Sequence, residues 1–304
     1  MSDFSRRRSL LLAALATPLA GLSVSSRASN QAHSQYATEL AKIETSVGGR
    51  LGVAAINTAN GMHVQYRGDE RFPLCSTFKL IVAAAILQRS TTDALILQKR
   101  IRYTQAEVAK SGYAPVTLKH LANGMTIDEL CAATLQYSDN AAANFLMKEL
   151  GGPAAVTAYT RSIGDEVFRL DRWEPELNTA IPGDARDTST PVAMMQAVHK
   201  LALADALAPA QRAQLVSWLK GNTTGSKRIL AGVADGWQVG DKTGTGAYGT
   251  TNDVGVIWPV HGAPIVTAIY FTQTEKAAAP RDDVIAAATR VVVAGLMTGN
   301  KTAG

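Results

Sequence analysis

Ser76 and Lys79 are the residues in this sequence whose type and spacing most directly suggest covalent chemistry. They begin an apolar segment, and a separation of three positions puts both side chains on one face of a helix. The free N–H groups at a helix start favour a developing negative charge. A buried, neutral amine can accept the hydroxyl proton of a neighbouring serine. The pair therefore predicts a serine nucleophile at Ser76.

The spacing alone is weak evidence, because the chain contains a second Ser-x-x-Lys, from Ser217 to Lys220. That copy directly precedes Gly221, which is typical of a helix end, and we assign it no role. An isolated match of this kind is more often structural than catalytic. The prediction for Ser76 therefore depends on the other motifs of the chain.

Ser138-Asp139-Asn140 is the second motif and lies in a region of helical pattern. A second hydroxyl near the nucleophile can pass a proton to a leaving nitrogen, and an asparagine amide can hold a substrate carbonyl. Ser, Asp and Asn are also the residues that most often cap a helix N-terminus. The structural alternative for this motif is therefore a simple cap.

Lys242-Thr243-Gly244-Thr245-Gly246 is the third motif and falls on a predicted strand. The glycines allow a substrate backbone to approach closely, while the lysine and the two hydroxyls can bind a carboxylate. The structural alternative is a glycine-rich strand end. Lys110-Ser111-Gly112 has a similar pattern, but it lies in a predicted loop and we give it no role.

Glu174 and Asn178 lie four residues apart in a loop rich in charges and prolines. A carboxylate and an amide at this spacing can hold one water molecule between them and activate it as a nucleophile. The structural alternative is a solvated loop.

Strand patterns occur at both ends of the chain and helical patterns in its middle. The Asn60-Gly61 turn predicts a hairpin between its two flanking strands. Phe78 to Leu87 is almost wholly apolar and predicts a helix buried on all sides. We predict strands over residues 51–57, 62–67, 237–243, 253–258 and 264–271, and helices over residues 35–47, 78–87, 283–297 and within 127–150.

This order of elements favours an α/β fold of the α+β type, with an antiparallel sheet built from both ends of the chain and covered by helices. We predict an α/β lobe from residues 35–72 and 221–300 and an inserted all-helical lobe from residues 73–220. The active site is expected in the cleft between the two lobes.

The first 28 residues have the pattern of a cleaved export signal, with Arg6, Arg7 and Arg8 before an uncharged apolar run. The paired arginines fit a twin-arginine route and an ordinary signal about equally well. We expect a periplasmic protein with no membrane anchor after cleavage. Removing four arginines and Asp3 changes 30 basic against 25 acidic residues to 26 against 24, so the net charge falls from +5 to +2.

That small charge, without a basic stripe, gives no support for nucleic-acid binding. The five histidines lie far apart in the sequence, so we expect no metal site and no cofactor.

The three motifs and the Glu174 loop occur together in the class A serine β-lactamases, which this chain resembles over residues 35–297. Within them it is most similar to the chromosomal penicillinases of Gram-negative bacteria, on the segments 135–140, 168–175, 241–244 and 248–253. The resemblance implies a five-stranded antiparallel sheet flanked by helices, a monomer, and hydrolysis of penicillins and cephalosporins with resistance to them. It also implies sensitivity to mechanism-based β-lactamase inhibitors.

The resemblance also implies a role for each motif residue. Ser76 attacks the β-lactam carbonyl, with its own N–H and that of Thr245 as the oxyanion hole. Either Lys79 or Glu174 is the acylation base, and Ser138 passes a proton to the ring nitrogen. Glu174 and Asn178 activate the deacylating water. The residues implied in substrate binding are Asn140, Lys242, Thr243, Gly244, Thr245, Arg228, Tyr113 and Trp173.

Further matches are structural. Arg172 and Asp187 resemble the ion pair that clamps the Glu174 loop, Asn144 resembles the residue that pins it, and the peptide before Pro175 is expected to be cis. The family's disulfide partners are missing for Cys75 and Cys131, where this chain has Gly246 and Ala83. We therefore predict two free thiols.

Two other functions share part of this pattern. A DD-peptidase or penicillin-binding protein acting on cell-wall peptides would also use Ser-x-x-Lys, but it lacks a deacylating Glu. A non-catalytic β-lactam sensor would hold the acyl group and would need a membrane anchor or partner domain. Glu174 and Asn178 favour a hydrolase over both.

Overall fold

A five-stranded antiparallel sheet forms the centre of the protein in the computed structural model, which describes residues 22–297 and side chains from residue 35 onward. The strand order is β2-β1-β9-β8-β7. The strands are β1 (Arg50–Asn57), β2 (His63–Tyr66), β7 (Gln238–Thr245), β8 (Thr251–Trp258) and β9 (Ile265–Thr272). Strands from both ends of the chain thus share one sheet, as the sequence predicts.

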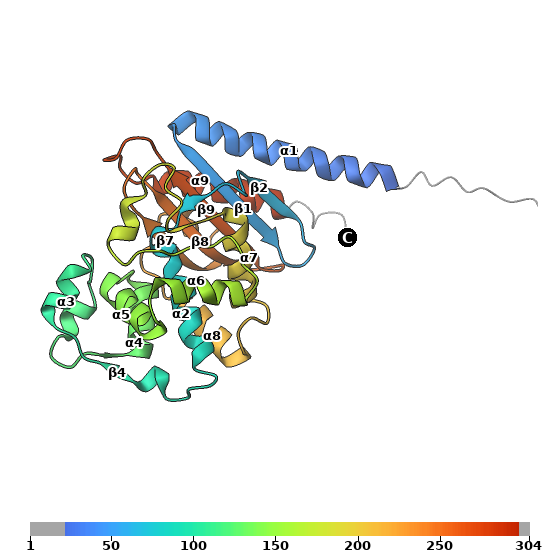
Figure 1. The fold of residues 1–304 in the computed structure, drawn as a ribbon. Coiled ribbons are helices and arrows are strands. Elements are labelled where there is room, and N and C mark those ends of the chain that lie inside the picture. Colours follow the sequence, from blue (N-terminus) through green and yellow to red (C-terminus); the bar gives the residue numbers. More distant parts are fainter. Residues whose placement is uncertain (1–21, 298–304) are drawn as a thin grey trace, which may run out of the picture.

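Both faces of this sheet are covered, which explains why β8 and β9 are buried along almost their whole length. Helices α1 (Leu22–Val47) and α9 (Asp282–Met297) pack on one face, and α7 (Pro191–Ala202) lies on the other (Figure 1). The first face closes a core that includes Leu40, Val53 and Ile269. The second face joins the larger core that includes the side chains of the central helices.

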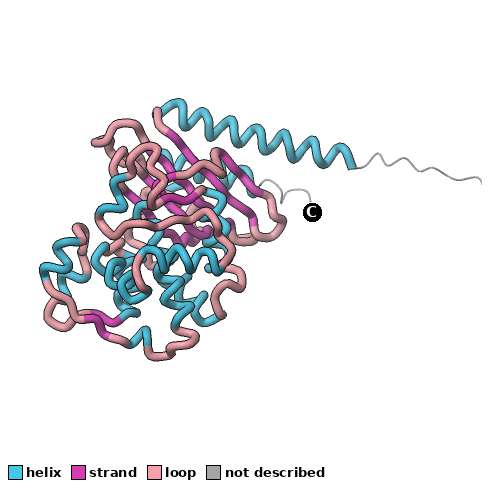
Figure 2. Tube along the Cα trace, viewed as in Figure 1, coloured by secondary structure: helices cyan, strands magenta, loops and turns pink. Residues whose placement is uncertain are grey.

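The middle of the chain is mainly helical (Figure 2). The nucleophile region is a 3-10 turn, η1 (Cys75–Thr77), followed by α2 (Phe78–Arg89), whose residues 78–87 are all buried as predicted. The other helices here are α3 (Gln105–Lys110), α4 (Ile127–Gln136), α5 (Asn140–Leu150), α6 (Pro153–Ser162) and α8 (Pro209–Lys220). Further 3-10 turns are η2 (Ile96–Gln98), η3 (Thr117–His120), η4 (Glu176–Thr179) and η5 (Leu230–Gly232).

Two pairs of very short strands interrupt the helical region. β3 (Phe72–Pro73) pairs with β6 (Thr188–Ser189), and β4 (Arg100–Ile101) pairs with β5 (Met125–Thr126). The first pair ties the segment before the nucleophile to the end of the Glu174 loop. The division into lobes at residues 72 and 221 stays a prediction.

The helical pattern predicted within residues 127–150 proves to be two helices, α4 and α5, broken at Ser138. Ser138 has φ 57°, a left-handed conformation that non-glycine residues rarely adopt. Asp139 then caps α5 by accepting a hydrogen bond from the N–H of Ala142. The break turns the second serine of the site away from a regular helix and toward Lys79.

The predicted export signal, residues 1–28, lies mostly outside the described residues, which begin at Leu22. No helix in the described part of the chain combines the length and apolar character needed to cross a bilayer.

Candidate active site

Ser76 lies in a tight turn between β3 and the buried helix α2. The preceding residue, Cys75, has φ 43°, so the nucleophile turn contains a strained non-glycine position. A Cβ atom on Gly244 of β7 would lie 2.8 Å from the carbonyl oxygen of Leu74, and one on Gly246 would lie 2.6 Å from the Cys75 sulfur. Glycine at these two positions is therefore what lets β7 pack against the nucleophile turn.

Lys79 is fully buried, and its amine connects Ser76 with the second motif and with Glu174. It donates to Ser76 Oγ at 2.9 Å, to the Ser138 carbonyl at 2.8 Å and to Asn140 Oδ1 at 2.6 Å. It also forms an ion pair with Glu174 Oε1 at 3.0 Å. Burial lowers the pKa of Lys79, while the Glu174 carboxylate opposes that shift. A lysine held this way can exchange a proton with the Ser76 hydroxyl.

Ser138 lies between two lysines. Its Oγ is 3.4 Å from Lys79 Nζ and 3.1 Å from Lys242 Nζ. The neighbouring Asp139 is fully buried and fixes the segment, because its carboxylate accepts hydrogen bonds from the Thr117 hydroxyl and backbone N–H. The second serine of the site is thus held where it can relay a proton.

Glu174 lies beside Lys79 and reaches the same Ser76 hydroxyl. Its Oε1 accepts from Ser76 Oγ at 3.4 Å, and its Oε2 accepts directly from the Asn178 amide. Asn144 on α5 holds the Glu174 backbone with two bonds, donating to its carbonyl at 2.9 Å and accepting from its N–H at 3.0 Å. The peptide between Glu174 and Pro175 is cis. The predicted pinning by Asn144 and the predicted cis bond are both confirmed.

Arg172 and Asp187 close the base of this loop, as the resemblance implied. Arg172 Nε lies 2.5 Å from Asp187 Oδ2, and the other carboxylate oxygen accepts from the N–H groups of Asp171 and Arg172 at 2.7 and 2.9 Å. The Asp187 carbonyl accepts from the N–H of Leu74 at 2.8 Å. One residue thus ties the loop to itself and to the nucleophile turn.

Lys242 and Thr243 on β7 supply the predicted carboxylate-binding groups. Lys242 is fully buried, and burial together with the nearby charge of Lys79 lowers its pKa to about 7. Its Nζ also donates to the Thr243 carbonyl at 2.9 Å. The Thr243 hydroxyl lies 2.6 Å from that of Thr224, which fixes its orientation.

Arg228 is nearly buried behind the end of β7. Its guanidinium donates to the Thr245 hydroxyl at 2.8 Å and to the Gly244 carbonyl at 2.9 Å, and it pairs with Asp282 at 2.7 Å. Arg228 therefore positions the Thr245 side chain. Its positive charge lies next to Thr245, which is one of the residues predicted to bind the substrate carboxylate.

Three further predicted contacts lie at the edges of this arrangement. The backbone carbonyl of Tyr113 accepts from the N–H of Asn140 at 2.8 Å, and the residue as a whole is 59% exposed. The ring of Trp173 lies beside Gly152 at the start of α6. Substrate contact by these two rings, and the N–H of Thr245 as an oxyanion donor, stay predictions.

Ser111 is a site residue that sequence reasoning missed. Its carbonyl accepts from the Asn140 amide at 3.0 Å, and its hydroxyl accepts from the Asn144 amide at 3.0 Å. It therefore orients one predicted substrate contact and the residue that pins Glu174. The segment Lys110-Ser111-Gly112 lies at the end of α3 and not on a strand, so its likeness to the third motif does not indicate this role of Ser111.

Both cysteines are free and buried, as predicted. Among the residues the structure describes, no three His, Cys, Asp or Glu side chains gather closely enough to hold a metal ion.

Comparison with known proteins agrees with this geometry. The model of the beta-lactamase enzyme family matches residues 35–296. The chain is 54% identical to β-lactamase OXY-2 of Klebsiella oxytoca over 95% of this chain and 98% of that one. It is 53% identical to a carbapenem-hydrolysing β-lactamase KPC of the same species, over 95% and 97% of the two chains.

A solved β-lactamase from Desulfarculus baarsii DSM 2075 has the same fold, with a TM-score of 0.84 and 55% identity over 86% of this chain and 97% of that one. The family match over residues 35–296 includes the sheet, the nucleophile turn and helix α2 with Ser76 and Lys79, and the loop that carries Glu174. The chain belongs to the beta-lactamase enzyme family, with the motifs of its class A serine enzymes.

Proposed function

We propose that this β-lactamase opens the ring amide of penicillins and cephalosporins in two steps, through an ester on Ser76. The observation that carries the proposal is the placement of two groups that can accept a proton, paired with each other, within reach of one hydroxyl. Lys79 Nζ lies 2.9 Å and Glu174 Oε1 lies 3.4 Å from Ser76 Oγ. One hydroxyl can thus be activated for attack while a second base serves the later hydrolysis.

In the first step Ser76 Oγ attacks the carbonyl carbon and the ring C–N bond breaks. The Ser76 proton leaves to Lys79, or to Glu174 and from there to Lys79, whose amine lies 3.0 Å from the carboxylate, so that Glu174 is ionised again before the second step. Ser138 then donates its proton to the departing ring nitrogen and regains one from Lys79 or Lys242, which lie 3.4 and 3.1 Å from its oxygen. The step ends with an acyl-enzyme and a protonated amine.

In the second step water attacks the ester carbonyl, and Glu174 accepts its proton. Asn178 and Asn144 fix the direction of that carboxylate through its side chain and its backbone. The Ser76 oxygen regains its proton as it leaves, so the enzyme returns to its starting state. This step separates a β-lactamase from a penicillin-binding protein.

Substrate recognition is assigned to β7 and α5. Lys242, Thr243 and Thr245 would bind the substrate carboxylate, with Arg228 holding the Thr245 hydroxyl. Asn140 would contact the side-chain amide of the substrate, and the N–H groups of Ser76 and Thr245 would stabilise the oxyanion, a contribution often worth about 3 kcal/mol. Mechanism-based inhibitors that acylate Ser76 are expected to use the same groups.

The proposed location is the periplasm, after removal of residues 1–28 as an export signal. The arginines before the apolar run at residues 10–22 support export, and a secreted monomer would meet its antibiotic substrates there. N-terminal sequencing of the protein recovered from the periplasm would test this directly. A chain that keeps Met1 in the cytoplasm would contradict it.

Intact-mass spectrometry with benzylpenicillin tests the two-step scheme. The native protein should hydrolyse the substrate without a lasting adduct, and Glu174→Ala should accumulate one acyl group. Glu176→Ala removes an exposed carboxylate from the same loop, and as the matched control it should keep turnover. A long-lived adduct on the native protein would favour a penicillin-binding protein or a sensor instead.

A further inference from the structure

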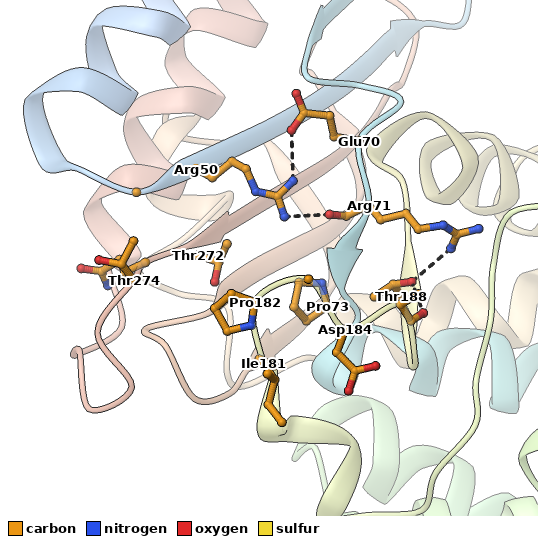
Figure 3. Close-up of a pocket in the computed structure, with 15 residues that line it drawn as sticks. Arg50, Glu70, Arg71, Pro73, Ile181, Pro182, Asp184, Thr188, Thr272 and Thr274 are labelled. Carbon is orange, nitrogen blue, oxygen red and sulfur yellow. Dashed lines mark hydrogen bonds and ion pairs between the residues drawn. The ribbon is translucent and has the colours of Figure 1, made fainter.

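A cavity of about 560 Å³ lies behind the Glu174 loop, between that loop and the edge of the sheet (Figure 3). Its walls come from residues 180–185 of the loop, from the start of β1, from the segment around β3 and from the end of β9. None of the residues assigned above to catalysis or substrate binding lines it. Its volume is in the range of small-molecule sites in proteins.

The walls of this cavity are connected to the active site along the chain. Pro73 lines it three residues before Ser76, and Ala180 lines it two residues after Asn178, in a left-handed conformation with φ 46°. The Asn178 carbonyl also accepts from the N–H of Ala247, which follows the β7 motif. A molecule wedged between these walls would therefore press on the backbone that positions the deacylating groups.

The charges around the cavity leave one cation available. Arg50 pairs with Glu70 at 3.0 Å, and Asp184 pairs with Arg186 at 2.7 Å. Arg71 donates to the Thr188 hydroxyl at 3.0 Å, so its guanidinium lies at the Thr188 end of the cavity, away from Ile181 and Pro182 (Figure 3). It has no carboxylate partner among the described side chains. A guanidinium of this kind is suited to a carboxylate ligand.

Apart from Asp184, the loop residues 180–185 that line the cavity have no polar side chain. Ile181 is 45% exposed, and Pro182 follows it, facing the wall formed by Pro73 (Figure 3). Exposed isoleucine beside proline offers a surface for an aliphatic or aromatic body, since burying it removes apolar area from water.

We propose that this cavity binds a small amphipathic carboxylate, with its anion at Arg71 and its apolar body against Ile181 and Pro182, and that its occupancy slows deacylation. The second part rests on the acyl-enzyme scheme above. A displacement of about 1 Å in a positioned catalytic group can cost up to about 100-fold in rate. Acylation, which also uses Lys79 on the buried helix α2, is expected to change less.

Octanoate is the probe, and binding is measured first, by calorimetry on the native protein, without any substrate. Arg71→Gln should raise the Kd of octanoate at least tenfold, while Arg89→Gln on the surface of α2 should leave it unchanged. Ile181→Asp should also weaken binding, whereas Ile181→Leu should not. Equal affinity in native protein and Arg71→Gln would overturn the site, whatever the enzyme's activity.

The kinetic arm tests the coupling with a penicillin substrate. Octanoate should lower kcat at least twofold and enlarge the acyl-enzyme burst, and neutral octanamide should do neither. Arg71→Gln should remove the effect. A rise in KM alone would place octanoate at the substrate carboxylate site instead, and binding without a change in kcat would refute the coupling.

Discussion

Asp187 is the position where a small chemical change should separate the two halves of the reaction. Its carboxylate accepts from two loop N–H groups and from Arg172, and its carbonyl accepts from the N–H of Leu74 beside the nucleophile turn. Its φ of 53° is left-handed, which asparagine tolerates better than most residues. Asp187→Asn therefore removes the charge while it keeps an amide oxygen and the backbone conformation.

The size of the effect follows from these contacts. Breaking a fully buried ion pair costs about 3–5 kcal/mol. Arg172 is 19% exposed on its side chain and keeps a hydrogen bond to Thr179 at 2.9 Å, so we expect about 2 kcal/mol for Asp187→Asn. In a chain of this size that lowers Tm by about 4–8 °C. Asp187→Ala adds two unsatisfied N–H groups and a strained backbone, and should cost about 4 kcal/mol.

Stopped-flow kinetics with a chromogenic cephalosporin, together with thermal unfolding, measures both consequences. Asp187→Asn should slow deacylation at least tenfold with a smaller change in acylation, because Glu174 is held by the loop, whereas Lys79 lies on the buried helix α2 and is also held by Ser138 and Asn140. Asp184→Asn, which alters an exposed pair in the same loop, is the control and should cost less than about 1 kcal/mol. Equal loss in both rate constants, or an unchanged Tm, would refute the clamp.

Four further outcomes follow from the structure. Because burial lowers the pKa of Lys242 to about 7, kcat/KM should fall as pH rises above about 7. In a pH–rate profile, Lys242→Arg should move this fall to higher pH. A fall that stays at the same pH would exclude Lys242 as its cause. In the unfolded chain the Lys242 amine keeps its proton up to about pH 10.5. The contribution of Lys242 to the free energy of unfolding should therefore rise as pH increases from about 7 to about 10.5. Asn144→Ala should slow deacylation about tenfold, because both of its hydrogen bonds to the Glu174 backbone are lost. Burst kinetics should show a larger acyl-enzyme burst, and an unchanged burst would contradict this. Ellman's reagent should count two thiols in denaturant. It should react slowly with Cys75 and Cys131 in the native protein, since burial raises the pKa of both. Finding no thiol in denaturant would contradict the prediction that both cysteines are free.

The sheet and the nucleophile helix could be predicted because local signals agree there with the tertiary structure. The Asn60-Gly61 turn, the strand patterns at both ends and the apolar run after Ser76 each predict the element that forms. The roles of Lys79 and Lys242 required the motifs to be read together, since each motif alone has a structural alternative.

Features that depend on long-range packing could not be predicted. A helix cap at the Ser138-Asp139-Asn140 motif was one of its two interpretations, and Asp139 does cap α5. The placement of Ser138 between two lysines that lie 59 and 104 residues away in the sequence has no local signal. Ser111 acts only through two asparagines brought beside it by α5. The cavity behind the Glu174 loop is formed by four separate segments, and no local pattern indicates it.

The central claim is that Ser76 carries the acyl group and that Glu174 removes it. Peptide mapping of acid-quenched Glu174→Ala after benzylpenicillin tests it most directly, because trypsin releases residues 72–79, in which Ser76 and Thr77 are the only hydroxyl side chains. We predict one penicilloyl group on Ser76 of that peptide, and none in the double variant that also carries Ser76→Gly. An acyl group on another peptide, or an adduct that survives Ser76→Gly, would contradict the account.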